Sequence, residues 1–131
     1  MKKLAILICG AMVAVSCSTT ATALSKKQVS VEGTHWVLAD TVRGNQPTLT
    51  IETNRVSGDS GCNNYFGELV LDATAGNFSV KNIGSTRKAC DNQSVEANFL
   101  TMLREADKYT ATETTLELYK GGLLLMKFNK K

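Results

Sequence analysis

Side chains that could support catalysis or bind a metal are few in this chain. Its 131 residues include four cysteines and one histidine. A serine or cysteine nucleophile normally needs a neighbouring base, so any conventional catalytic pair would depend on His35. A zinc site needs three or four protein ligands, which one histidine and scattered cysteines do not supply. We therefore expect no catalysis, no resident metal and no cofactor.

The remaining candidate side chains lie in residues 57–67, which read SGDSGCNNYFG. Residues 58–61 resemble a nucleophile elbow, but GxSxG requires one more residue before the second glycine. The glycines also lack the GK[ST] ending of a phosphate-binding loop. The stretch is typical of a bent strand, with glycines that permit positive φ and polar groups that bond to nearby backbone. Alternatively, it forms an interaction motif for a ligand or partner, composed of Gly61, Asn63, Asn64, Tyr65 and Gly67.

The N-terminus has the pattern of an export signal. Lys2 and Lys3 precede an apolar run at residues 4–15, which is too short to span a membrane as a helix. The run ends in Ala-Val-Ser-Cys17 and resembles a bacterial lipobox. Residues 1–16 are therefore predicted to be a lipoprotein signal peptide and Cys17 the acylated first residue. Cleavage after Ala23 is the rival, and it would give a periplasmic or secreted protein.

Residues 17–31 are rich in Ser, Thr, Ala and Lys without apolar periodicity, so we expect a flexible tether ahead of a domain at residues 32–131. Serine at position 18, where Asp would signal retention in the inner membrane, predicts a lipid anchor (palmitate and related acyl chains) in the outer membrane. Cys9 lies in the removed run, and Cys17 is acylated or lost. Cys62 and Cys90 remain in an oxidising compartment, which predicts one structural disulfide.

Hydropathy patterns indicate strands, then one helix, then strands. Alternation marks strands from Trp36 onward. Val95, Phe99, Met102, Leu103 and Ala106 share one helical face, which predicts an amphipathic helix ending near Lys108. Alternation then returns in three segments up to Phe128. The predicted interior consists of Trp36, Leu38, Leu49, Ile51, Leu69, Leu71, Phe99, Met102, Leu103, Leu116 and Leu118.

Charge and composition limit the possible partners. Fifteen Lys and Arg against 12 Asp and Glu give a net charge of +3, too small an excess to predict a nucleic-acid surface. The hydrophobic content of 43% excludes disorder of the whole chain, and its length suits one domain. We expect a monomer that contacts the membrane only through its N-terminal lipid.

Residues 58–67 fit the pattern GxxGCNxYxG, and residues 86–90 fit TxxAC. With Trp36 near the start and an LxL strand followed by a glycine turn near the end, the chain resembles the META domain family. That family includes the heat-inducible bacterial lipoproteins called HslJ. The resemblance implies a mainly β (α+β) fold: a small, incompletely closed antiparallel β-barrel with one amphipathic α-helix inserted before the last three strands.

Three functions remain open. The resemblance and the N-terminus favour a non-enzymatic envelope lipoprotein that binds an unknown envelope protein or an apolar ligand and supports tolerance of heat or antibiotic stress. The alternative is a secreted inhibitor of a hydrolase, because compact disulfide-linked β domains present rigid loops at little ordering cost. A hydrolytic enzyme using Ser60, Asp59 or Tyr65 has the weakest support, because no base accompanies them.

Overall fold

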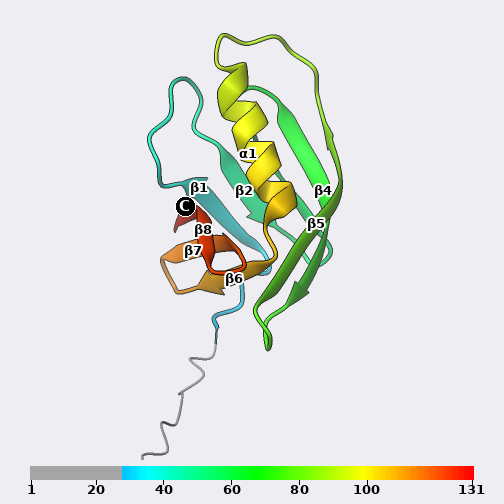
Figure 1. Ribbon diagram of the computed structural model, residues 1–131, viewed down its shortest axis with the longest axis vertical. Helices are drawn as coiled ribbons and strands as arrows, with labels where there is room; N and C mark the ends of the chain where they lie inside the picture. Colours follow the sequence, from blue (N-terminus) through cyan, green and yellow to red (C-terminus); the bar gives the residue numbers. More distant parts are fainter. Residues whose placement is uncertain (1–27) are drawn as a thin grey trace, which may run out of the picture.

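The computed structural model describes residues 28–131. The predicted signal peptide, the acylated Cys17 and the rival cleavage site lie outside these residues. Within residues 28–131 the chain forms eight strands and one helix (Figure 1). In chain order they are β1 (Thr34–Leu38), β2 (Thr48–Ile51), β3 (Arg55–Asp59), β4 (Asn64–Asp72), β5 (Asn77–Ser85), α1 (Gln93–Glu105), β6 (Lys108–Ala111), β7 (Thr115–Lys120) and β8 (Leu123–Lys130).

The strands follow one another around an antiparallel barrel, and β8 returns to pair with β1. The ring is weakest between β5 and β6, where Asn77 and Lys108 form the one pair in register. Helix α1 precedes β6 and packs against β5 on this side of the barrel (Figure 1). The mainly β fold, the antiparallel ring of strands and the helix before the last three strands are therefore confirmed, and the ring closes between β5 and β6 through this single pair.

Large side chains fill the interior. Trp36, Leu49, Leu116 and Phe128 have almost no exposed surface. Phe99 enters from α1, with its ring centroid 5.4 Å from that of Tyr65 and 6.3 Å from that of Phe128. Because α1 buries this ring in the strand core, the helix is an integral part of the core.

Two predicted interior residues are only half-buried. Leu71 lies near the end of β4, opposite Phe78 and close to the turn into β5, where the barrel wall ends. Met102 lies on the flank of α1, because the buried face contains Leu100 in its place. The helix also ends at Glu105 and not near Lys108, since Ala106 is extended and the chain enters β6.

The folded domain begins earlier than residue 32. Val31, assigned to the tether from its sequence, is buried in the core. The side chain of Gln28 bonds to the backbone of Tyr109 and Ala111 on β6. The tether prediction for residues 28–31 is therefore wrong, because these contacts to β6 lie too far along the chain for local composition to reveal them.

Candidate functional site: the corner between β3 and β4

The GxxGCNxYxG motif forms the corner where β3 passes into β4. Ser60 N–H donates to the Asn63 carbonyl at 2.8 Å, and Gly61 N–H donates to Asp59 Oδ1 at 2.7 Å. Gly61 has a φ of 104°, and a Cβ there would lie 2.9 Å from Val95 Cγ1 of α1. A side chain at position 61 would be strained in its backbone and would also collide with the helix.

Asn63 is the centre of the corner and is buried. Its Oδ1 accepts hydrogen bonds from Lys88 N–H at 2.7 Å and Thr86 Oγ1 at 2.9 Å. Its Nδ2 donates to the Lys88 carbonyl at 3.2 Å and to Glu96 Oε2 at 2.9 Å. The carboxamide thus pairs with both backbone groups of Lys88, as a neighbouring peptide would, and joins the TxxAC segment to the corner.

The predicted disulfide links the same two segments. Cys62 and Cys90 are bonded, with their Cα atoms 5.9 Å apart. This confirms the pairing. The corner is therefore held to the segment before α1 by one covalent bond and by the hydrogen bonds of Asn63.

Ser60 is fully buried, so its hydroxyl has no surface from which a substrate could be reached. Its Oγ lies 2.7 Å from both the Asn63 carbonyl oxygen and Glu96 Oε1. The single hydroxyl proton of Ser60 is therefore donated inside the protein, to one or the other of these two acceptors. His35 lies on β1, exposed, with its Nδ1 3.0 Å from Thr50 Oγ1.

Glu96 also belongs to this cluster, although it is not among the site residues predicted from the sequence. It lies on the same face as Phe99, Leu100 and Leu103, at offsets of 3, 4 and 7 residues. A carboxylate on the apolar face of a helix needs a polar partner, which here is supplied by Ser60 and Asn63. That spacing was the signal in the sequence that could have identified it.

Tyr65 and Gly67 belong to the core. The Tyr65 hydroxyl donates to the Thr48 carbonyl at 2.7 Å, and burial, followed by the charge of Asp59, raises its pKa above the ordinary tyrosine value. A Cβ at Gly67 would lie 2.6 Å from Val80 Cγ1. Of the five residues in the candidate interaction motif, Asn64 alone is exposed.

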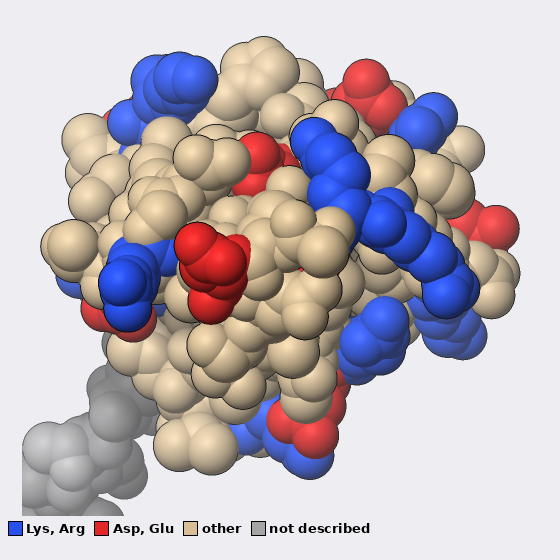
Figure 2. Space-filling model, turned by 90° about the horizontal axis from the view of Figure 1, so that it is seen from above, with Lys and Arg blue, Asp and Glu red and all other residues tan. Residues whose placement is uncertain are grey.

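Surface features near the corner are polar and mixed in charge. A shallow hollow of about 480 Å³ lies between α1 and residues 85–89, which include Arg87 and Lys88. Seen from above, basic side chains form separate groups, the longest a row at the right, with acidic side chains nearby (Figure 2). Within residues 28–131 no group of three or more His, Cys, Asp or Glu side chains could hold a metal ion.

Residues 28–131 match the META domain family, which is most of the chain. This chain belongs to the META domain family. Two solved structures share the fold of this META domain. One is the NMR structure of a protein from Burkholderia xenovorans, with a TM-score of 0.65, 25% identity, and coverage of 77% of this chain and 83% of that one. The other is an NMR structure of a protein with a TM-score of 0.60, 22% identity, and coverage of 77% and 94%.

A search of curated proteins gave no match to this META domain. Over residues 28–131, no helix is long and apolar enough to cross a membrane.

The geometry of the corner accounts for the GxxGCNxYxG pattern. The glycines allow close approach, the cysteine and the first asparagine attach the TxxAC segment, and the tyrosine completes the core under α1.

Proposed function

We propose that this META domain is the folded part of a non-enzymatic envelope lipoprotein that binds a protein partner. In this proposal the chain is acylated at Cys17 and held at the outer membrane, and it supports tolerance of heat or antibiotic stress, as the HslJ-like resemblance implies. Family membership over residues 28–131 and the lipobox-like sequence before Cys17 support it.

The observation that carries the non-enzymatic part is the use of the motif's polar groups inside the protein. Ser60, Asn63 and Tyr65 each bond to backbone or to Glu96, and none of the three is exposed. A catalytic group must reach a substrate, whereas these groups fasten elements together. The motif therefore supports a scaffold that presents a surface elsewhere.

The packing of the barrel favours a protein partner over an apolar ligand. The rings of Phe99, Tyr65 and Phe128 lie against one another inside the barrel. Side chains occupy the space that a lipid would need, as they do in many barrels of this size. The hollow between α1 and residues 85–89 is at the surface, where another protein can contact it.

Chemical crosslinking in intact cells tests this function. Cells carrying the native protein are stressed with heat or an antibiotic, crosslinked and solubilised, and the protein is isolated with its adducts. We expect one or a few discrete envelope proteins, and their loss in a Cys17→Ser variant that lacks the anchor. Isolation with bound lipid but no protein adduct would contradict the partner proposal, as would a substrate turnover that Ser60→Ala abolishes.

A further inference from the structure

Strand β6 extends past Asn77, the first residue of β5. Part of the outer edge of β6 therefore has no neighbouring strand. The two strands pair at Asn77 and Lys108, and Tyr109 N–H still reaches the carbonyl of Gly76 at 2.9 Å. Beyond that point β5 has turned away into residues 73–76, while β6 continues to Ala111. Unpaired strand edges present backbone donors and acceptors that another chain can use.

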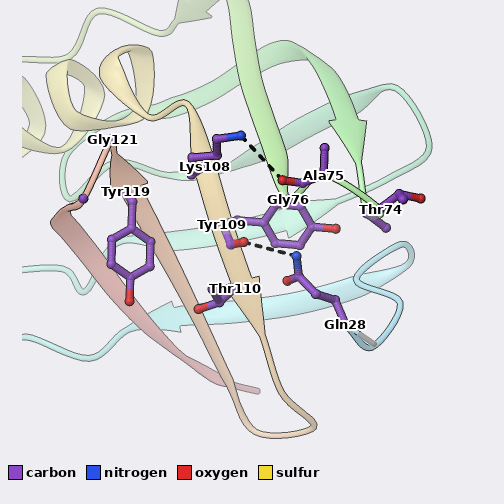
Figure 3. A pocket seen from close by; sticks show the side chains of 11 residues that line it. Gln28, Thr74, Ala75, Gly76, Lys108, Tyr109, Thr110, Tyr119 and Gly121 are labelled. Atoms are coloured by element: carbon purple, nitrogen blue, oxygen red, sulfur yellow. Dashed lines mark hydrogen bonds between the residues drawn. The ribbon is translucent and has the colours of Figure 1, made fainter. Parts of the chain in front are cut away.

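The side chain of Gln28 covers this edge. Its Nε2 donates to the Tyr109 carbonyl at 3.3 Å, and its Oε1 accepts from Ala111 N–H at 2.9 Å (Figure 3). One carboxamide thus satisfies two backbone groups that a paired strand would satisfy. Displacing it breaks two hydrogen bonds, one of them long, and leaves the pairing of β6 with β7 intact.

Hollows flank the covered edge on both sides. The larger, about 630 Å³, lies against the β4–β5 turn, β6 and the β7–β8 turn. The second, about 570 Å³, lies against Val29 and residues 110–114. Both include Gln28 and Thr110, so an extended chain running along β6 would cross from one to the other. Successive side chains of a strand point to opposite faces, which suits two separate hollows.

Tyr109 lines the larger hollow, and its hydroxyl is buried without a hydrogen-bond partner among residues 28–131. The whole residue is 2% exposed. In Figure 3 this hydroxyl lies between Thr74 and Gln28. A buried hydroxyl without a partner is costly, so a ligand that supplies an acceptor here would be favoured.

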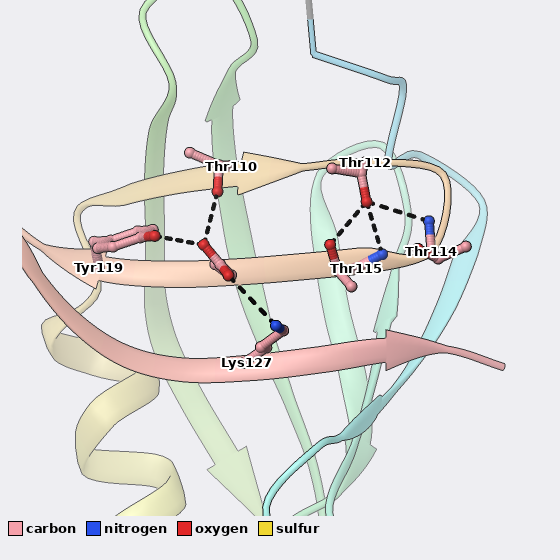
Figure 4. A network of polar contacts seen from close by, with 7 residues as sticks. Thr110, Thr112, Thr114, Thr115, Tyr119 and Lys127 are labelled. Carbon is pink, nitrogen blue, oxygen red and sulfur yellow. Dashed lines mark hydrogen bonds and ion pairs between the residues drawn. The ribbon is translucent and has the colours of Figure 1, made fainter.

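The wall of the larger hollow formed by β7 is held in place by a polar network. Glu117 accepts a hydrogen bond from the Tyr119 hydroxyl and lies 3.9 Å from Lys127 Nζ (Figure 4). This network fixes Tyr119, which lines the hollow.

We propose that the seam between β5 and β6 binds an extended peptide segment of a protein partner by strand addition to β6. The peptide backbone replaces the Gln28 carboxamide on the Tyr109 carbonyl and the Ala111 N–H, and its side chains occupy the two hollows. The inference rests on the proposed function and names the class of partner and its site. A polypeptide is favoured over a lipid because it carries donors and acceptors at the spacing of a strand edge.

Peptide selection with paired substitutions tests this site. A phage-displayed library of random nine-residue peptides is selected on the full-length wild-type protein in detergent, and the best peptide is synthesised. Its affinity is then measured for wild type, Gln28→Ala, Ala111→Pro and the matched control Gln93→Ala. Gln28→Ala and Ala111→Pro both break the Gln28–Ala111 bond, but only the proline removes a donor that the peptide needs.

We expect Gln28→Ala to bind at least threefold more tightly, Ala111→Pro at least tenfold more weakly, and Gln93→Ala as wild type. Amide hydrogen exchange needs no variant, and the Ala111 N–H of wild type should exchange at least tenfold more slowly with peptide bound. The site is overturned if no peptide is recovered, if affinities are equal throughout, or if Ala111 exchange does not change. A dimer of this chain that Ala111→Pro dissociates would also overturn it.

These outcomes are separate from those of the proposed function. Selection requires neither the lipid nor the native partner. A negative result would remove the seam as the binding site, while the envelope adducts expected from crosslinking could still appear. Loss of those adducts together with intact peptide binding at Ala111 would instead count against the envelope function.

Discussion

At the residue scale, two adjacent asparagines have opposite environments. Asn63 is buried and bonds to Thr86, Lys88 and Glu96, whereas Asn64 is exposed. Asn63→Ala should lower the free energy of unfolding by about 2 kcal/mol or more, because it leaves the Lys88 N–H and the Glu96 carboxylate short of partners.

Urea denaturation at pH 7 measures this difference. The matched control, Asn64→Ala, should change the free energy of unfolding by no more than about 0.5 kcal/mol. Equal effects of the two substitutions would show that Asn63 does not fasten the corner.

Tyr65 should make stability fall at alkaline pH. Burial and then the charge of Asp59 raise its pKa in the folded protein, so above about pH 10 the unfolded chain releases a proton that the folded chain retains. The contribution is complete below pH 10 and is lost as pH rises, at up to about 1.4 kcal/mol per pH unit. Urea denaturation between pH 8 and 11.5 should show a shallower decline for Tyr65→Phe than for wild type.

Tyr65→Phe should also cost about 1–3 kcal/mol at pH 8, because the Thr48 carbonyl loses its donor. Tyr109→Phe is the control, since it removes a buried hydroxyl that has no partner within residues 28–131, and it should be neutral or stabilising at pH 8. A decline of wild-type slope in Tyr65→Phe would mean that Tyr65 ionises freely in the folded state.

The sequence predicted the residue types of the corner better than their roles. Local chemistry was enough to predict that glycines stand at the bend and that polar side chains, such as the tyrosine hydroxyl, hydrogen-bond to the backbone. It could not predict which of two neighbouring asparagines faces inward, because the turn geometry of residues 60–63 and the register of β4 decide it. The partners of Asn63 are also 23 to 33 residues away.

At the scale of elements, α1 should be essential to the core. Phe99 lies between Tyr65 and Phe128, so Phe99→Ala would open a cavity in the barrel. We expect a loss of about 3–5 kcal/mol in unfolding free energy by urea denaturation. The exposed neighbour Asn98→Ala should stay within about 0.5 kcal/mol. A loss below about 1 kcal/mol for Phe99→Ala would make the helix peripheral.

The disulfide should stabilise the fold mainly by restricting the unfolded chain across its 28-residue separation. The double substitution Cys62→Ser with Cys90→Ser should cost about 2–4 kcal/mol and leave the far-ultraviolet circular dichroism spectrum unchanged. Thiol labelling of the unreduced mature protein, followed by peptide mapping, gives a second readout. Label on both Cys62 and Cys90 would contradict the bond.

Among the elements, alternation identified most strands, and the 3.6-residue period identified α1. The bent strand predicted over residues 57–67 covers only part of β3, which begins at Arg55, and the pairing of Gly58 with Tyr65 in the ladder was not predicted. The attachment of Gln28 to Ala111 spans 83 residues and has no local signature. The hydropathy pattern of a single sequence does not specify which strands or segments pair when they are far apart in the chain.

At the scale of the whole molecule, the described chain begins at the seam. Gln28 contacts β6, and Cys17 lies 11 residues before it. If these residues form the tether predicted from their composition, its root-mean-square reach is about 20 Å. Acylation at Cys17 would therefore hold the seam close to the membrane surface, where the peptide segment of an envelope partner could reach it.

Mass spectrometry of the intact protein extracted from cell envelopes tests the lipid-anchored assignment most directly. We predict a mature chain that starts at Cys17 and carries a diacylglyceryl group and an amide-linked acyl chain. Three acyl chains anchor a protein stably, whereas a single chain binds a membrane only reversibly. A soluble chain that starts at Leu24 without acyl groups would contradict the assignment and would place this META domain in the periplasm or outside the cell.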